Sequence, residues 1–271
     1  MSDPYCGYGR SKLAAEEIVL DYHARTGAPV CIYRFPNVFG KWSRPHYNTV
    51  VATFCHNLSR GLPVQVSNPA HVLRFVYIDD LVRAFVDYVS QAAPDPARTH
   101  YEIAAVYTIT LGELHDLLVS FQAGRKQSLL PDLANPLVKY LYSTFVSFLD
   151  PQDLAYPVDL KTDDRGWLFE LVKSRAAGQI FVSRTRPGIT RGNHYHDTKI
   201  EKFCVIQGQG IIRFRHVFSP EILAYPVDDQ AIRIVDIPPG YTHSIENTGR
   251  GDLITLFWAN EIFDPQRPDT H

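Results

Sequence analysis

The sequence predicts two successive parts of different fold class, an α/β part over residues 1–157 and an all-β part over residues 158–271. In the first part, helix-forming stretches alternate with short apolar runs, a pattern typical of a sheet with crossover helices. In the second part, many short apolar stretches are separated by turn residues, which is typical of a barrel or sandwich. With 271 residues, 45% of them hydrophobic, the chain is long enough to form two hydrophobic cores.

The first part begins with a predicted helix over residues 8–26, where good helix formers are followed by Gly27 and Pro29. Residues 30–35 form an apolar run that predicts a short buried strand. The later elements expected in this part are a helix at 48–58, a strand at 74–77, and helices at 79–90, 108–121 and 137–149.

Two of these helix starts carry polar residues. Thr110 is expected to be an N-cap, and Asp79 and Asp80 are expected to cap their helix rather than to take part in chemistry. In the second part, strands are expected at 169–172, 179–184, 202–206, 210–215, 232–237 and 253–258.

The composition excludes several classes of partner. The 27 basic and 29 acidic side chains give a net charge of -2 without a basic block, so we expect neither nucleic acid nor a membrane surface as partner. The apolar runs are too short to span a bilayer. The four cysteines are scattered without a C-x-x-C pair, which indicates reduced thiols in a cytoplasmic protein: Cys6, Cys31, Cys55 and Cys204.

Three histidines and one glutamate stand out in the second part. His194 and His196 stand at positions i and i+2 of the run 188–208, a spacing that places both on one face of a regular strand. Glu201 can reach the same place from the next strand, and His243 from a later strand after a Pro-Gly turn. Neutral imidazoles with one carboxylate suit zinc, iron, manganese or nickel, so these four residues predict a metal site.

The two runs that carry these residues, 188–208 and 238–247, resemble the two sequence motifs of the cupin superfamily. The first run matches at every defining position, and the second lacks only the leading glycine. The resemblance implies a jelly-roll barrel with a metal-binding pocket. The alternative is a barrel of the same shape in which the histidines serve as ordinary acids of the pocket.

A second motif lies in the first helix. Tyr8 and Lys12 form a Y-x-x-x-K pattern, and a spacing of four places both side chains on one helix face. A lysine beside a tyrosine favours the phenolate, as a general acid for carbonyl reduction requires. Taken alone, the pattern is also what an ordinary surface turn of a helix shows.

The context of this pair resembles the C-terminal half of an extended short-chain dehydrogenase/reductase that acts on nucleotide sugars. The resemblance rests on the series around Tyr8, residues 34–40 and residues 73–82. It implies that Tyr8 and Lys12 are the catalytic pair, that Asn37 meets the substrate and that Arg74 holds its diphosphate. The alternatives are a turn residue after a strand for Asn37 and a surface ion pair for Arg74.

One part of a dinucleotide-binding fold is missing from the sequence. Such a fold opens with a strand, a glycine-rich turn and a helix, because pyrophosphate needs close approach to the backbone at a helix N-terminus. The chain has no early glycine cluster, and only seven residues precede Tyr8. We therefore expect a partial Rossmann-like reductase domain that binds NADPH only if the preceding part is present.

The whole arrangement resembles the CapF-type capsular polysaccharide biosynthesis proteins, in which a reductase half precedes a cupin. The resemblance covers essentially the entire chain and rests also on the motifs at 163–170, 192–196 and 258–261. It implies a homodimeric, zinc-binding, bifunctional enzyme acting on a UDP-linked 4-keto-6-deoxy-N-acetylhexosamine, on the route to UDP-N-acetyl-L-fucosamine. The cupin would epimerise C3, and the reductase would reduce C4 with NADPH.

Some assignments stay open at this stage. The metal ligands also suit iron or manganese, so an iron cupin oxygenase or isomerase is one alternative, and a non-catalytic sugar-binding module with a structural metal is another. Arg184, Arg186 and Arg191 are candidates for holding a diphosphate, or are solvated strand charges. Tyr195 is one candidate for the epimerisation base.

Overall fold

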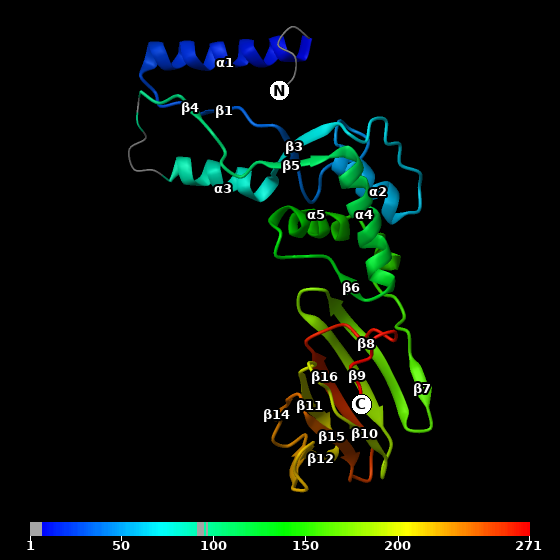
Figure 1. Ribbon diagram of the computed structural model, residues 1–271. Helices are drawn as coiled ribbons and strands as arrows, with labels where there is room; N and C mark the ends of the chain where they lie inside the picture. Colours follow the sequence, from blue (N-terminus) through cyan, green and yellow to red (C-terminus); the bar gives the residue numbers. More distant parts are fainter. Residues whose placement is uncertain (1–6, 91–94, 96) are drawn as a thin grey trace. The chain divides into compact units, whose positions relative to one another are not determined.

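The computed structural model describes residues 7–90, 95 and 97–271, and Cys6 therefore lies outside the described residues (Figure 1). The chain divides into two compact units. The first unit runs to Gln122 and also includes Asn135–Gln152, whereas the second comprises Ala123–Ala134 and Asp153–His271. Among the described residues, no helix combines the length and the apolarity that crossing a membrane requires.

The first unit is mixed α/β. Its helices are α1 (Gly7–Thr26), α2 (Val50–Ser59), α3 (Ile78–Val89), α4 (Leu111–Lys126, which continues past Gln122) and α5 (Pro136–Ser147). Its strands are β1 (Ile32–Tyr33), β2 (Asn37–Phe39), β3 (Val72–Tyr77), β4 (His100–Tyr101) and β5 (Tyr107–Thr110). They form a parallel β1–β4 pair and a three-stranded sheet in the order β2-β3-β5, whose β2–β3 pair is parallel.

The start of α4 confirms the predicted cap. The Thr110 hydroxyl accepts a hydrogen bond from the Glu113 amide at 3.2 Å, and the Glu113 carboxylate accepts one from the Thr110 amide at 2.8 Å. This reciprocal pair is a capping box. The expectation for α3 is wrong, because Tyr77 is its N-cap residue and Asp79 and Asp80 lie within its first turn, where their charge still favours the helix dipole.

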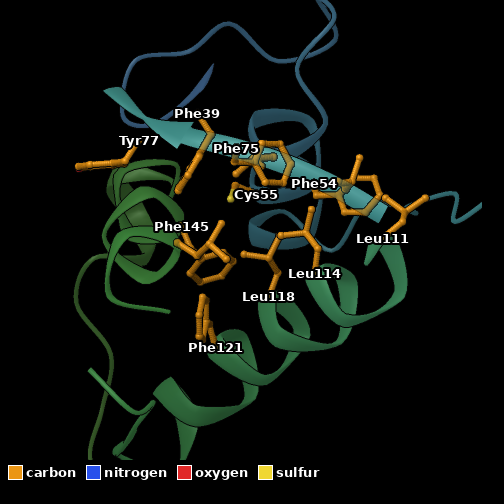
Figure 2. Close-up of a cluster of buried hydrophobic side chains, with 13 residues drawn as sticks. Phe39, Phe54, Cys55, Phe75, Tyr77, Leu111, Leu114, Leu118, Phe121 and Phe145 are labelled. Carbon is orange, nitrogen blue, oxygen red and sulfur yellow. The ribbon is translucent and has the colours of Figure 1, made fainter. Parts of the chain in front are cut away.

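A single apolar cluster holds the three-stranded sheet against α2, α4 and α5 (Figure 2). Phe39 and Phe75 contribute from adjacent strands with their ring centres 5.5 Å apart. Phe121 of α4 and Phe145 of α5 meet with their ring centres 6.0 Å apart. Edge-on ring contacts of this kind add to the free energy gained from burial. The other labelled members of the cluster are Phe54, Cys55, Tyr77, Leu111, Leu114 and Leu118.

The second unit is almost entirely β apart from the end of α4, and a short 3-10 turn at Pro151–Asp153 leads into it from the first unit. Its strands are β6 (Leu129–Leu130), β7 (Lys161–Asp163), β8 (Gly166–Ser174), β9 (Gly178–Thr185), β10 (Thr190–His194), β11 (Glu201–Gln207), β12 (Gln209–His216), β13 (Ile222–Asp228), β14 (Ile234–Ile237), β15 (Tyr241–Asn247) and β16 (Leu253–Ala259). One sheet has the order β14-β11-β16-β9-β8-β6, with β7 paired to β8, and the other has the order β10-β15-β12-β13.

The core of this unit joins its two sheets. Phe203 and Phe257 enter it from the larger sheet, and Ile212, Phe214 and Ile245 enter it from the smaller one. All five side chains are at most 5% exposed. Because one buried cluster draws on both sheets, the two sheets face each other across it, as in a sandwich or barrel.

The strand expectations for this unit are mostly confirmed, but the short strands β6 and β7 and the longer β13 were not expected. No strand was expected over β13, which the structure shows paired to β12 at the edge of its sheet. Its sequence does not alternate apolar and polar residues, so the period-2 pattern of a half-buried strand is absent. In the structure, Ile222 to Pro226 are all exposed. Pro226 itself is typical of an edge strand, which has no second neighbour to receive an amide hydrogen.

Candidate functional site

The four predicted metal ligands come together in the second unit. One ligand atom from each of His194, His196, Glu201 and His243 lies within 4.8 Å of every other. His194 ends β10, Glu201 begins β11, and His243 lies in β15, so both sheets contribute to the cluster. His196 lies in the irregular segment 195–200 between β10 and β11.

The route by which the two neighbouring histidines converge differs from the expected one. The prediction that His194 and His196 share one face of a regular strand is wrong, since β10 ends at His194 after a break in register with β15. The break falls at Asn193, whose φ of 67° is unusual for a residue other than glycine. Gly192 is required beside it, because a Cβ there would lie 2.7 Å from the carbonyl oxygen of His243.

Hydrogen bonds fix two of the imidazole rings. The His243 Nδ1 donates to the Tyr241 carbonyl oxygen at 3.1 Å, and the His196 Nδ1 donates to the Asp269 carbonyl oxygen. Each ring therefore directs Nε2 toward Glu201, whose Oε2 is 3.3 Å from the Nε2 of His243 and 3.4 Å from that of His196. Backbone partners on the far nitrogen are the usual way to orient a metal-binding histidine.

The inward-facing atoms of the cluster are buried without ordinary partners. His196 Nε2, Glu201 Oε2 and His243 Nε2 are inaccessible to solvent, and within the described structure they have no polar partner apart from one another. Buried polar atoms are nearly always satisfied in folded proteins, so an unsatisfied group of three in one place calls for a ligand. The atoms are one carboxylate oxygen and imidazole nitrogens, and this donor set fits a divalent metal ion.

The charges of His194 and Glu201 agree with this donor set. Burial, followed by the neighbouring rings of His243 and His196, lowers the pKa of His194 to about 4, so its ring is neutral near pH 7. Burial by itself would raise the pKa of Glu201, but contacts with the two other imidazoles outweigh it and lower that pKa to about 2. An ionised carboxylate and a neutral imidazole are the forms that bind a metal.

A cavity of about 200 Å³ opens beside the cluster. Three phenylalanine side chains form much of its wall: the Phe181 and Phe257 rings stack at 4.6 Å, and Phe203 meets Phe257 edge-on at 4.5 Å. The remaining lining residues are Arg165, Leu168, Ser183, Arg191, Gly192, His194, Glu201, His243 and Ile245. The cavity thus joins an apolar wall, two guanidinium groups and three of the four cluster residues.

The two arginines of the cavity share one acidic partner. Arg165 binds the Asp163 carboxylate through Nε at 2.9 Å and Nη2 at 2.5 Å, and Arg191 Nη2 lies 3.7 Å from the same carboxylate. Arg191 also donates from Nε to the Thr185 hydroxyl at 3.1 Å, which holds its guanidinium in place. Burial lowers the pKa of Arg191, although Asp163 opposes this, and the group remains a cation.

Only one of the three arginines considered as diphosphate contacts lines this cavity. Arg191 does so, whereas Arg184 forms an ion pair with Asp252 at 2.7 Å and Arg186 donates to a main-chain carbonyl at 3.2 Å. Arg165 was not among the predicted residues. The available signal was its position in the turn between β7 and β8, where the Arg165 amide donates to the side chain of Asp163.

The predicted residues of the first unit occupy two places. Tyr8 and Lys12 share one face of α1, with the lysine Nζ 5.2 Å from the centre of the tyrosine ring. Asn37 begins β2 and lines a cavity of about 450 Å³, whereas Arg74 is exposed on the neighbouring strand and is not part of that lining. Within the described part of the chain, no hydrogen bond or ion pair joins Tyr8 or Lys12 to either residue.

Two family models match the chain in succession. Residues 2–104 match the NAD dependent epimerase/dehydratase family, and residues 161–271 match the family described as polysaccharide biosynthesis C-terminal domain. The chain therefore combines an epimerase/dehydratase-type part with a polysaccharide biosynthesis C-terminal domain, and the second of these contains the histidine cluster.

Similar proteins are known over nearly the whole chain. A Pseudomonas aeruginosa protein named UDP-2-acetamido-2,6-beta-L-arabino-hexul-4-ose reductase is 40% identical over 264 residues, which cover 97% of this chain and 70% of that protein. The crystal structure of the capsular polysaccharide assembling protein CapF from Staphylococcus aureus is similar with a TM-score of 0.91 and 44% identity, over 98% of this chain and 72% of that one. The chain belongs to the CapF family of capsular polysaccharide proteins.

A further CapF structure, solved with the inhibitor 3-isopropenyl-tropolone, is similar with a TM-score of 0.88 at 44% identity, over 94% of this chain and 74% of that chain. The spore coat polysaccharide biosynthesis protein SpsL of Bacillus subtilis is 24% identical over 118 residues, which cover 40% of this chain and 78% of that protein.

Proposed function

We propose that this protein is a nucleotide-sugar enzyme of surface polysaccharide biosynthesis. Its second unit epimerises C3 of a UDP-linked 4-keto-6-deoxy-N-acetylhexosamine, and its first unit takes part in the NADPH-dependent reduction of C4, on the route to UDP-N-acetyl-L-fucosamine. The observation that carries the proposal is the buried histidine–glutamate cluster beside a cavity with a phenyl wall and two guanidinium groups. The name of the Pseudomonas relative, a reductase of a UDP-linked hexul-4-ose, supports the substrate class.

We further propose that the second unit is a cupin barrel that holds zinc, with iron or manganese as alternatives. Two facing sheets with a core between them support the barrel. His194, His196, Glu201 and His243 would be the ligands, since three of their inward-facing atoms are buried and, in the described structure, face only one another. The protein would act as a homodimer in the cytoplasm.

The chemistry of epimerisation matches what the cavity offers. A ketone at C4 acidifies the hydrogen on C3, and removing that hydrogen places negative charge on the C4 oxygen. A divalent ion bound by the cluster would supply Lewis acidity toward that oxygen. The phenyl wall excludes water and contacts the apolar faces of the sugar, which strengthens every electrostatic interaction in the cavity.

The two arginines suit the other end of the substrate. Arg191 is fixed by Thr185, and Arg165 by Asp163, so both guanidinium groups are preorganised. A guanidinium binds phosphate through paired N–H donors, and a held side chain loses less entropy when it does so. They would hold the diphosphate and thereby place the sugar ring at the cluster.

The reduction would use the residues of the first unit. Tyr8 would protonate the C4 oxygen as hydride arrives at C4 from NADPH, with Lys12 one helix turn away to hold the phenol. Asn37, at the wall of the larger cavity, would contact the substrate, and Arg74 would hold its diphosphate. These roles rest on the resemblance to nucleotide-sugar reductases.

The test follows the C3 hydrogen directly. The metal-loaded protein is incubated in heavy water with the UDP-linked 4-keto-6-deoxy sugar, and the C3 proton is observed by NMR. We expect the signal to disappear with wild type, and to persist with His194→Ala. His115→Ala, which alters a histidine of α4 outside the cluster, is the matched control and should exchange normally. An unchanged C3 signal with folded, metal-loaded wild type would refute the proposed epimerisation.

A structural metal is the second candidate, and one observation favours it. Four protein ligands complete a tetrahedral zinc shell and leave no open position for substrate. His196, Glu201 and His243 are at most 7% exposed, as expected of a closed site. If chelation unfolds the second unit before exchange at C3 is lost, the metal is structural. If exchange is lost while circular dichroism is unchanged, the metal is catalytic.

A further inference from the structure

The irregular segment 195–200, which carries His196 between β10 and β11, is held by the last residues of the described chain. Segments of this kind leave main-chain N–H groups without strand partners, and buried ones must find others. Five of its six N–H groups donate to residues 260–271. The donors are those of Tyr195 to the His271 carbonyl, of Asp197, Thr198 and Lys199 to the Asp269 carboxylate, and of Ile200 to the Asn260 side chain.

Asp269 makes most of these contacts. Its Oδ1 accepts from the Asp197 amide at 2.9 Å, and its Oδ2 accepts from the amides of Thr198 and Lys199 at 2.9 and 2.8 Å. The Thr198 hydroxyl donates to the same Oδ2 at 3.0 Å. In addition, the main-chain carbonyl of Asp269 accepts from the His196 Nδ1. One residue therefore fixes both the His196 ring and the backbone that follows it.

We propose that Asp269 is a positioning residue for His196, a role that rests on the metal site proposed above. Its carbonyl selects the tautomer of His196 that carries hydrogen on Nδ1, which turns Nε2 toward Glu201 and keeps its lone pair available to a metal ion bound there. Its carboxylate holds the three residues after His196, so the ring cannot swing away from the cluster.

The carboxylate is chemically specific for this task. Both of its oxygens accept hydrogen bonds from main-chain N–H groups, and Oδ1 also lies 3.6 Å from the His271 Nε2. An asparagine at position 269 would turn its own NH₂ group toward one of these donors and lose at least one hydrogen bond. A carboxylate that accepts charge-assisted hydrogen bonds is also a stronger partner than a neutral amide.

Other contacts anchor the same segment independently. Tyr195 and His271 exchange two main-chain hydrogen bonds of 3.1 Å, and their rings stack at 5.2 Å. The Ile200 amide donates to the Asn260 side-chain oxygen at 3.0 Å, and the Asn260 amide donates to the Ile200 carbonyl at 3.1 Å. Because these contacts stay when the Asp269 side chain is shortened, we expect Asp269→Ala to fold.

The test compares Asp269→Ala and Asp269→Asn with wild type and with Asp229→Ala as a matched control. The Asp229 carboxylate likewise accepts from a main-chain amide, that of Gly208 at 2.8 Å, but at a turn that carries none of the cluster residues. Four readouts are taken: zinc affinity by competition with a chromophoric chelator, the absorption bands of bound Co²⁺, the His196 tautomer by ¹⁵N NMR of the metal-free protein, and thermal unfolding.

We expect Asp269→Ala to weaken zinc binding by about 10-fold or more, as loss of a group that orients a ligand usually does, and to shift the Co²⁺ bands. Asp269→Ala keeps the main-chain carbonyl but releases the backbone of residues 197–199, so the His196 ring is no longer held against that carbonyl and the fraction with hydrogen on Nδ1 should fall. Asp269→Asn should lie between Asp269→Ala and wild type. Asp229→Ala should unfold at a lower temperature with unchanged affinity and spectrum. Should Asp269→Ala not fold, Asp269→Asn carries the comparison.

Wild-type affinity, Co²⁺ bands and tautomer in the Asp269 variants would overturn the positioning role. The same holds if Asp229→Ala loses affinity equally, since the effect would then be general destabilisation. If wild type binds neither zinc nor Co²⁺, the proposed metal site fails instead. The tautomer of His196 in the metal-free protein separates the two cases, because it responds to Asp269 whether or not a metal binds.

Discussion

Protonation of His194 should control the acid stability of the metal-free protein. In the folded chain the pKa of this imidazole is lowered from 6.5 to about 4, first by burial and then by the neighbouring rings of His243 and His196. The unfolded chain therefore binds a proton between these two values while the folded chain does not. Stability rises with pH wherever the unfolded state binds more protons, so stability is lost as the pH falls from 6.5 to 4.

The size of the effect follows from the shift. A fall from 6.5 to about 4 corresponds to about 3 kcal/mol at ~1.36 kcal/mol per pKa unit. The other cluster residues act in different windows: the pKa of Glu201 is lowered to about 2, so its contribution is lost below pH 4.5. The pKa of His196 is raised, because contacts with Glu201 outweigh burial, so its contribution is present below pH 6.5 and lost as the pH rises above that value.

The assay is urea unfolding of chelator-treated protein between pH 4 and 7, with the free energy of unfolding plotted against pH. His194→Gln replaces the titrating ring by a neutral side chain of similar size. Between pH 4 and 7, the free energy of unfolding of this variant should change by about 3 kcal/mol less than that of wild type. His115→Gln, which changes a histidine outside the cluster, should leave the slope as in wild type. Parallel curves for wild type and His194→Gln would refute this reasoning.

Three further predictions concern the ion, the substrate and the fold. Glu201→Gln removes the carboxylate, and titration calorimetry should show zinc affinity at least 10-fold weaker; an unchanged affinity would exclude Glu201 as a ligand. Arg191→Lys keeps the charge but not the paired donors, so KM for the UDP-sugar in the exchange assay should rise about 10-fold, whereas Arg184→Lys, outside the cavity, should match wild type. Phe145→Ala empties a fully buried position and should destabilise the first unit by about 3–5 kcal/mol in urea unfolding. Val146 is exposed, so Val146→Ala should lower the free energy of unfolding far less. Equal losses in the two variants would contradict the burial argument.

The four residues of the cluster could be predicted from the sequence because their identities and their order indicate a shared site. Their geometry could not, since a regular strand was expected where the chain breaks register at Asn193 and β10 ends at His194. The bend depends on Gly192 approaching β15, a contact between segments distant in sequence. The cluster therefore forms as predicted, although by a different local structure.

The residues that support the cluster could not be predicted from the sequence, for a related reason. Asp269 contacts residues 70 or more positions earlier in the chain, and nothing in its immediate sequence marks that partnership. Arg165 lay within a recognised motif, but its place in the cavity depends on how β7 and β8 pair. Helix spacing, by contrast, is local, which is why Tyr8 and Lys12 lie on one face of α1 as expected.

The measurement that tests the central claim most directly is exchange at C3 as a function of bound metal. The protein is stripped with a chelator, its fold is checked by circular dichroism, and zinc is added stepwise while loss of the C3 proton of the UDP-linked 4-keto sugar is followed in heavy water. We expect no exchange in the stripped protein and a rate that rises to a plateau at one zinc per chain. Full exchange without metal, or none at saturation, would contradict a metal-dependent epimerase.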